Sequence, residues 1–185
     1  TTRLSAHHKF GTISQRESFY ALQDTFKEYA DALLNELYWH DFYLMIAKHF
    51  PQVFEHAFQS KYDSINWIDD TNNENFKAWC AGKTGFPIVD AGMRELNETG
   101  YMHNHWRLGE EYFAHKLTDY DSAVNNGSWQ WAASTGCDAQ PYFRIFNPWL
   151  QQKRFDPQCA YIKHWVKELE NLEPKAIHNL EEQRP

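Results

Sequence analysis

Residues 82–100 read GKTGFPIVDAGMRELNETG, and their glycines and proline divide this part of the chain into helices. Gly82 stands where a residue in the left-handed conformation ends a helix, which we place at 74–81. Pro87 can occupy the first turn of a helix, where its missing N–H is not needed, so the next helix is expected over 88–99. The last glycine of the stretch then ends this second helix. The stretch therefore predicts two short helices joined by a tight turn.

Similar start and stop signals occur on both sides of this stretch. Ser14 and Glu17 form the S-x-x-E capping box that starts a helix, and Pro51 ends a longer helix with spaced apolar residues. The sequence has no run of alternating apolar and polar residues long enough to indicate a strand. Because neither a repeat nor a linker divides it, we predict one all-α domain over residues 1–185. Further helices are expected over 15–23, 30–48, 107–117, 129–134 and 158–170.

Composition narrows the class of protein. The chain has 185 residues and a net charge of −7, so any site for nucleic acid must be a local basic patch. The sequence contains three cysteines and no C-x-x-C pair, which favours a reducing, cytoplasmic location, at the nucleoid if the source is prokaryotic. It shows no long apolar run and no leader, so neither membrane insertion nor secretion is expected. It also lacks a metal-ligand motif such as H-E-x-x-H, so no metal is expected.

The segment 119–131 gathers acids, amides and indoles around one glycine, which we read as a turn. Asp119 and Asp121 could accept hydrogen bonds from a cation or from the N–H groups of a heterocycle, and Asn125 can both donate and accept. Taken singly, such carboxylates are more often turn residues or helix caps, and a single tryptophan is more often part of a core. The combination of all these groups favours a cofactor site.

Several longer motifs resemble the flavin-binding helical domain of DNA photolyases and cryptochromes. They are GKTGFPIVDAGMR at 82–94, YMHN at 101–104, NNGSWQWAAS at 125–134, YFRIFNP at 142–148, TTRLS at 1–5 and NELYW at 35–39. The NNGxWQW form looks most like the class I cyclobutane pyrimidine dimer enzymes. The resemblance implies an all-α domain of the photolyase type, without the N-terminal α/β antenna domain of that family.

The cofactor that the resemblance implies is FAD. The TTRLS stretch would hold the diphosphate, since hydroxyls, backbone N–H groups and a guanidinium suit an anion. The two carboxylates would lie at the isoalloxazine and ribityl side, and Asn125 would face the flavin N5. The expected cofactor-binding residues are Thr1, Thr2, Arg3, Leu4, Ser5, Asp119, Tyr120, Asp121 and Asn125.

A relay of indoles is also implied by the resemblance. Trp129 would be its member nearest the flavin, Trp106 the middle one and Trp67 the distal one. Indole is among the side chains most easily oxidised, so such a relay could carry a positive charge from the flavin towards solvent. The residues expected to take part in the chemistry are Glu36, Asn104, Asn125, Trp67, Trp106 and Trp129.

Contacts with DNA follow from the same resemblance. A base lesion must be flipped out to reach a buried cofactor, and aromatic walls stabilise extruded bases by stacking. Trp39 and Trp131 match the two tryptophans that hold the dimer, while the carboxylate of Glu36 and the amide of Asn104 would bind it. The expected DNA-binding residues are Glu36, Trp39, His40, Asn104, Trp131, Arg144, Gln151 and Lys153.

The sequence departs from the family at two places within these motifs. His40 stands where the family has a phosphate-binding arginine, and a neutral imidazole binds phosphate less well. The YMHN motif is followed at once by His105 and Trp106. About 17 family residues are thus absent between Asn104 and His105, including an arginine whose loss would leave the Asp119 charge without a partner.

The resemblance implies light-driven repair of cyclobutane pyrimidine dimers by electron transfer from reduced FAD, a carbon–carbon lyase reaction. The expected partner is UV-damaged DNA, and a monomer independent of membranes and metals is expected. Retention of Glu36, Trp39 and Trp131 favours repair. His40 and the absent segment favour the alternatives, a cryptochrome-like flavin photosensor or a non-catalytic fragment of a flavin domain.

Overall fold

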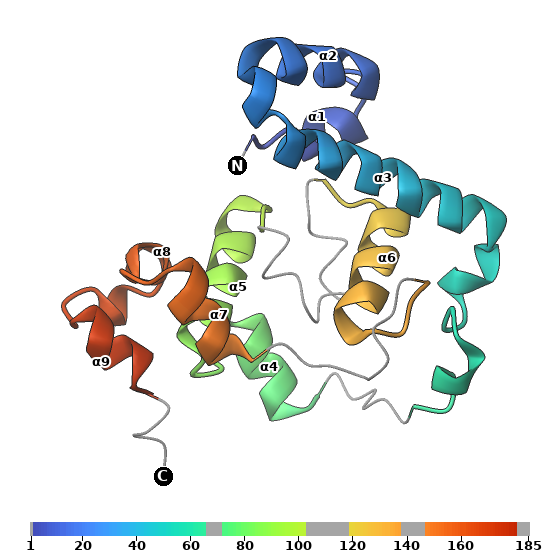
Figure 1. Ribbon diagram of the computed structural model, residues 1–185. Helices are drawn as coiled ribbons and strands as arrows, with labels where there is room; N and C mark the ends of the chain where they lie inside the picture. Colours follow the sequence, from blue (N-terminus) through green and yellow to red (C-terminus); the bar gives the residue numbers. More distant parts are fainter. Residues whose placement is uncertain (1, 66–71, 103–118, 138–146, 181–185) are drawn as a thin grey trace. The chain divides into compact units, whose positions relative to one another are not determined.

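The computed structural model describes residues 2–65, 72–102, 119–137 and 147–180, and the regular elements within them are helical (Figure 1). This confirms the predicted all-α fold. The described residues form two compact units. Unit 1 comprises 2–65 and 119–137, and unit 2 comprises 72–102 and 147–180. The assignment of one domain to residues 1–185 stays a prediction.

Unit 1 is built around the long helix α3. Its α-helices are α1 (Ser5–Lys9), α2 (Gln15–Phe26), α3 (Asp31–His49) and α6 (Ser122–Ala133), with 3-10 turns at Lys27–Tyr29, Pro51–Phe54 and Ser60–Tyr62. A small core of Leu22, Ala30 and Leu34 joins α2 to α3. Helix α3 packs on its other side against α6. Residues far apart in the sequence thereby come together in one unit.

The predicted capping box starts α2. The Ser14 hydroxyl accepts a hydrogen bond from the backbone N–H of Glu17 at 3.1 Å, as the S-x-x-E pattern predicts. Helix α2 runs on to Phe26, three residues beyond the predicted end. Helix α3 begins and ends within one residue of the predicted limits, and the chain leaves it just before Pro51.

Helix α6 begins earlier than predicted. The expected range was 129–134, after a glycine turn, but the helix starts at Ser122 because the Asp121 carboxylate caps it. That carboxylate accepts hydrogen bonds from the N–H groups of Ala123 and Val124, at 3.0 and 3.1 Å. Gly127 therefore lies inside a helix, and its reading as a turn was wrong.

Unit 2 packs its helices around α5. Its described elements are α4 (Glu74–Cys80), α5 (Pro87–Thr99), α7 (Pro148–Phe155), α8 (Ala160–Trp165), α9 (Pro174–His178) and a 3-10 turn at Lys167–Leu169. The core consists of Ile88 and Ala91 from α5, Cys159 and Ile162 around α8, and Ile177 from α9, each 1% exposed or less. Burial raises the pKa of the Cys159 thiol to about 11, so this cysteine is a structural residue.

The GKTGFPIVDAGMR motif forms a hydrogen-bonded turn in unit 2. The buried Asp90 carboxylate accepts bonds from the Thr84 N–H and hydroxyl at 2.7 Å each and from the Gly85 N–H at 3.0 Å. Arg94 donates to the Gly82 carbonyl at 3.1 Å. Gly82 has a φ of +61°, and a Cβ atom there would crowd the Arg94 side chain and the Asp90 carbonyl. The motif therefore shapes the α4–α5 corner.

The helix predicted over 158–170 is interrupted. Cys159 has a φ of +53°, so the helix begins only at Ala160, and it ends at Trp165 before a separate 3-10 turn. The Asp156 carboxylate still acts near its start, since it accepts from the N–H of Ile162 at 2.9 Å. The predicted helix over 107–117 lies outside the described residues. Helices α1, α7 and α9 were not predicted.

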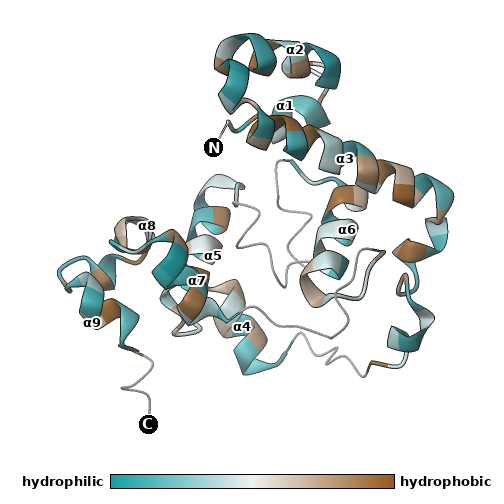
Figure 2. Ribbon diagram, in the orientation of Figure 1, coloured by the Kyte–Doolittle hydropathy of each residue, from teal (hydrophilic) through white to brown (hydrophobic). Residues whose placement is uncertain are grey.

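Helix α3 carries much of the exposed apolar surface of unit 1. Figure 2 shows hydrophobic residues along this helix, and Tyr38, Trp39, Leu44 and Met45 on it are exposed. In the parts of the chain that the structure describes, no helix has the length and apolar character needed to cross a bilayer.

Candidate flavin and DNA site

The start of α6 places three of the predicted cofactor-binding groups close together. Asp119 is 5% exposed, Asp121 is the capping residue, and the backbone N–H of Asn125 donates to the Asp121 carbonyl at 2.8 Å. Tyr120 lies between the two acids and is half-buried. The cap fixes the direction of the helix and so the position of Asn125 one turn later.

Asp121 has a further neighbour from α3. His40 Nε2 lies 3.8 Å from Asp121 Oδ2, and its Nδ1 lies 3.6 Å from Asp41 Oδ1. The side-chain amide of Gln15, the first residue of α2, donates to His40 Nδ1 at 3.3 Å. Helices α2 and α3 thus contribute side chains to the surroundings of Asp121, while α6 contributes backbone N–H groups.

A second histidine lies near His40. The His8 ring hydrogen-bonds the buried Ser18 hydroxyl at 2.7 Å. Burial lowers the pKa of His8, and the nearby His40 and His7 lower it further. The neutral form of His8 is therefore the favoured one in the folded chain.

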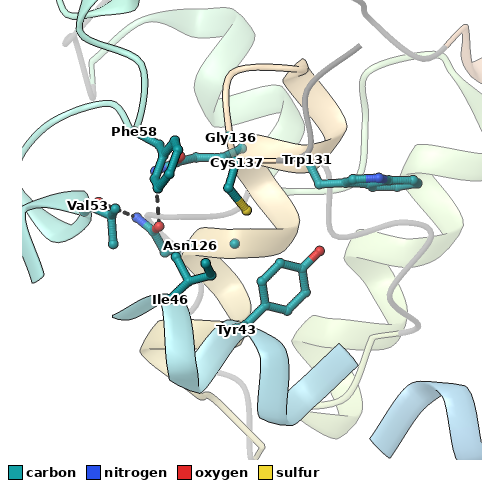
Figure 3. A pocket seen from close by; sticks show the side chains of 10 residues that line it. Tyr43, Ile46, Val53, Phe58, Asn126, Trp131, Gly136 and Cys137 are labelled. Atoms are coloured by element: carbon teal, nitrogen blue, oxygen red, sulfur yellow. Dashed lines mark hydrogen bonds between the residues drawn. The ribbon is translucent and has the colours of Figure 1, made fainter. Parts of the chain in front are cut away.

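Two predicted lesion-binding tryptophans lie in unit 1, on helices that pack against each other. Trp39 on α3 stacks on Tyr43, with ring centroids 5.9 Å apart and planes inclined by 28°. Tyr43 in turn lines a pocket together with Trp131 of α6 (Figure 3). Trp39 is 43% exposed and Trp131 is 40% exposed, so both indoles present ring surface to solvent. The structure therefore brings Trp39 and Trp131, the two sides of the predicted aromatic wall for flipped bases, into one unit.

The pocket has a hydrogen-bonded frame. Asn126 donates through its side-chain amide to the Val53 carbonyl at 2.8 Å (Figure 3). Gln130 donates to the Asn126 side-chain oxygen at 3.0 Å. Gln59 donates to the Gly136 carbonyl at 2.9 Å. These bonds hold the segment after α3 against α6.

Other predicted site residues have the following positions. Thr2, Arg3 and Ser5 are exposed at and just before the start of α1 in unit 1, and Leu4 is half-buried beside them. Glu36 is exposed on α3, three residues before Trp39. Trp129 is half-buried on α6, four residues after Asn125. In unit 2, Gln151 and Lys153 lie on α7, with Lys153 exposed. The predicted residues Thr1, Trp67, Asn104, Trp106 and Arg144 lie outside the described residues.

The donor set of unit 1 suits FAD. Arg3 supplies a cation, and Thr2 and Ser5 supply hydroxyls, which are suitable partners for a diphosphate. The carboxylates of Asp119 and Asp121 can accept bonds from sugar-alcohol hydroxyls and ring N–H groups. No group of three or more metal-ligating side chains occurs among the described residues.

The fold and these donors define a helical cofactor-binding domain. A family model described as the FAD binding domain of DNA photolyase matches residues 33–185. The chain therefore belongs to the family of FAD-binding domains of DNA photolyases, and the cofactor of this family is FAD.

Individual relatives agree with this assignment. A deoxyribodipyrimidine photo-lyase of Halobacterium salinarum is 41% identical over 206 residues, covering 98% of this chain and 42% of the relative. A crystal structure of an archaeal photolyase from Sulfolobus tokodaii with two FAD molecules is 46% identical. Its TM-score is 0.82, over 97% of this chain and 44% of that one. A class III photolyase from Agrobacterium tumefaciens is 38% identical with a TM-score of 0.89, over 100% of this chain and 42% of that one.

These similarities identify the family of the chain but not its class within that family. The chain spans less than half the length of the three relatives. The predicted family and the predicted helical fold are confirmed. The class I assignment is not confirmed, because a class III enzyme is also among the similar structures.

The sequence did not lead us to expect two residues near the site. Tyr43 is four residues after Trp39, a spacing that puts both rings on one side of a helix, so periodicity could have indicated it. Gln15 approaches His40 from 25 residues away, and only the packing of α2 on α3 reveals that contact.

Proposed function

We propose that this chain is the FAD-binding part of a photolyase that repairs cyclobutane pyrimidine dimers in DNA. The observation that carries the proposal is the arrangement within unit 1, where α6 is capped by Asp121, bears Asn125 and Trp131 and packs against the helix that bears Trp39. One helix thus joins a set of polar groups suited to a flavin to an aromatic surface suited to extruded bases.

The chain's own residues would bind and orient both molecules. Thr2, Arg3 and Ser5 would bind the diphosphate, and Asp119 and Asp121 would hold the side of FAD that bears the ribityl chain. Bound FAD, when reduced and excited by light, supplies an electron for splitting the dimer. Trp129, one turn after Asn125, would conduct charge when the flavin is photoreduced.

On the DNA side, exposed ring surface is the main binding feature. Trp39 and Trp131 would stack on the flipped bases, and the exposed Glu36 carboxylate could accept a hydrogen bond from a pyrimidine N–H. Lys153 and Gln151 on α7 would contact phosphates, which fix the position of the duplex without reading its sequence.

Class I is the branch that we propose, on the NNGxWQW form at 125–131. We also propose that the chain lacks a segment between Asn104 and His105. The alignment with the Halobacterium relative supports this, since it runs over 206 positions, more than the 185 residues of the chain.

The direct test uses the chain loaded with FAD. Its visible spectrum should show a flavin band, and illumination of the reduced protein with an oligonucleotide containing thymine dimers should remove dimers only in the light. Failure to retain FAD would contradict the cofactor assignment. Retention of FAD and light-driven flavin reduction without loss of dimers would instead support the photosensor.

Variants test the aromatic wall. Stacking contributes about 1–3 kcal/mol per base, so Trp39→Ala or Trp131→Ala should weaken binding of dimer-containing DNA about 5- to 150-fold. Tyr29→Ala is the matched control, because Tyr29 is an exposed aromatic of unit 1 that the site does not use. If all three substitutions weakened DNA binding equally, the proposal that Trp39 and Trp131 stack on the flipped bases would be wrong.

A further inference from the structure

We infer that Gln15 and His40 are positioning residues that orient the Asp121 carboxylate for FAD. This inference rests on the proposed function and adds to it. It differs from the phosphate contact that the family resemblance implies for His40.

The contacts form a line across three helices. Gln15 at the start of α2 donates to His40 Nδ1 at 3.3 Å, and His40 Nε2 faces Asp121 Oδ2 at 3.8 Å. The other oxygen of Asp121 accepts from the first N–H groups of α6. Both oxygens of this carboxylate therefore have a nitrogen neighbour.

The partner at Nδ1 determines which nitrogen of His40 carries the proton. An amide nitrogen can only donate, so Gln15 requires an unprotonated Nδ1. The proton of the neutral ring then lies on Nε2, the nitrogen that faces Asp121. At 3.8 Å the contact is longer than a hydrogen bond, but the N–H dipole still attracts the carboxylate oxygen and so restrains its orientation. Gln15 thus sets the tautomer that His40 needs to act on Asp121.

The charges around His40 also oppose a phosphate contact. Its two nitrogens lie 3.6 and 3.8 Å from the carboxylates of Asp41 and Asp121. A phosphate close enough to bind the ring would meet both negative charges. The ring side chain is 26% exposed, which limits its reach into solvent. These surroundings favour a role toward Asp121.

Two substitutions of His40 distinguish the roles of its two ring nitrogens. In His40→Gln the amide nitrogen can take the place of Nε2 and donate to Asp121. In His40→Asn the shorter amide reaches only the place of Nδ1. We expect His40→Asn to raise the Kd for FAD about tenfold, because the N–H that faces Asp121 is lost, and His40→Gln to stay within about twofold of the original chain.

A readout without FAD tests the tautomer itself. Nitrogen-15 NMR of the FAD-free chain should show His40 protonated at Nε2 at neutral pH, and Gln15→Leu should increase the fraction protonated at Nδ1. Protonation at Nδ1 in the original chain would overturn the inference. The melting temperatures of the FAD-free variants show whether each one folds.

The remaining outcomes are distinct. If His40→Asn leaves the Kd for FAD unchanged but weakens binding of undamaged DNA and lowers its salt dependence, His40 is a phosphate contact and the inference is wrong. If the original chain fails to bind FAD, the proposed function fails, whereas the NMR result still decides whether Gln15 sets the tautomer.

Discussion

Tyr43 of α3 lies against Gly127 of α6 so closely that a Cβ atom on Gly127 would overlap the tyrosine ring. Glycine inside a helix lowers its stability by about 1 kcal/mol relative to alanine, and here the lack of a side chain allows the close approach of the two helices. The contact also fixes Tyr43 between Trp39 and the pocket that Trp131 lines.

Gly127→Ala should therefore destabilise unit 1, although alanine is the better helix former. We expect a loss of about 1–3 kcal/mol in the free energy of unfolding, as for other overpacked sites, measured by urea denaturation. The double variant Tyr43→Ala/Gly127→Ala should be less destabilised than the sum of the single ones, because the overlap is gone. Additive effects would show that the ring is not the cause.

Asp90→Ala should destabilise unit 2 by about 2–4 kcal/mol, since it removes a buried acceptor of three hydrogen bonds from the α4–α5 turn. Asp90→Asn keeps one oxygen and should lose less. Glu98→Ala, at an exposed position of the same helix, serves as the control and should change the unfolding free energy little. Similar losses for the alanine variants at 90 and 98 would contradict this role.

The stability of the chain should fall as the pH drops below neutral, in part because of His8. Its pKa in the folded chain is lower than the usual 6.5, so the unfolded chain binds more protons as the pH falls below 6.5. The contribution of His8 is fully present above pH 6.5 and is lost as the pH falls through the folded value.

Melting temperatures between pH 7.5 and 5 measure this effect. His8→Gln should flatten the fall, whereas Lys9→Gln removes a neighbouring charge that does not titrate in this range and should leave the fall in place. An unchanged slope in His8→Gln would assign the effect to other groups.

Trp129→Phe should slow light-driven reduction of bound flavin, because phenylalanine is much harder to oxidise than tryptophan. Repair by protein reduced beforehand should remain nearly the same. Transient absorption measures the first rate, and the loss of dimers measures the second. If the flavin of the variant were photoreduced at the original rate, Trp129 would not be a member of the relay.

Local signals were sufficient for α2, α3, α4 and α5. Ser14, Gly82 and Gly100 end or begin helices through their own backbone and side-chain chemistry, so their effects could be predicted without knowledge of the packing. The start of α6 was missed because Gly127 was read as a turn and because the cofactor reading of Asp121 was preferred to its reading as a helix cap. The helix begins only after Cys159 because this residue has a positive φ. No sequence pattern predicts a positive φ at a residue other than glycine.

The candidate site could be predicted by residue type but not by contact. Motifs indicated Asp121, Trp39 and Trp131 as site residues, whereas the neighbours of Asp121 depend on how α2, α3 and α6 meet. Such contacts join residues that are distant in sequence, and periodicity carries no information about them.

Helix α6 presents the proposed groups on two sides. Asn125 and Trp129 are four residues apart and share one side, while Gly127 and Trp131, also four apart, share another that faces the pocket beside α3. Turning this helix about its axis would carry its two sides in opposite directions. A rotation of α6 would therefore move the proposed coenzyme groups and the proposed lesion-binding tryptophan at the same time.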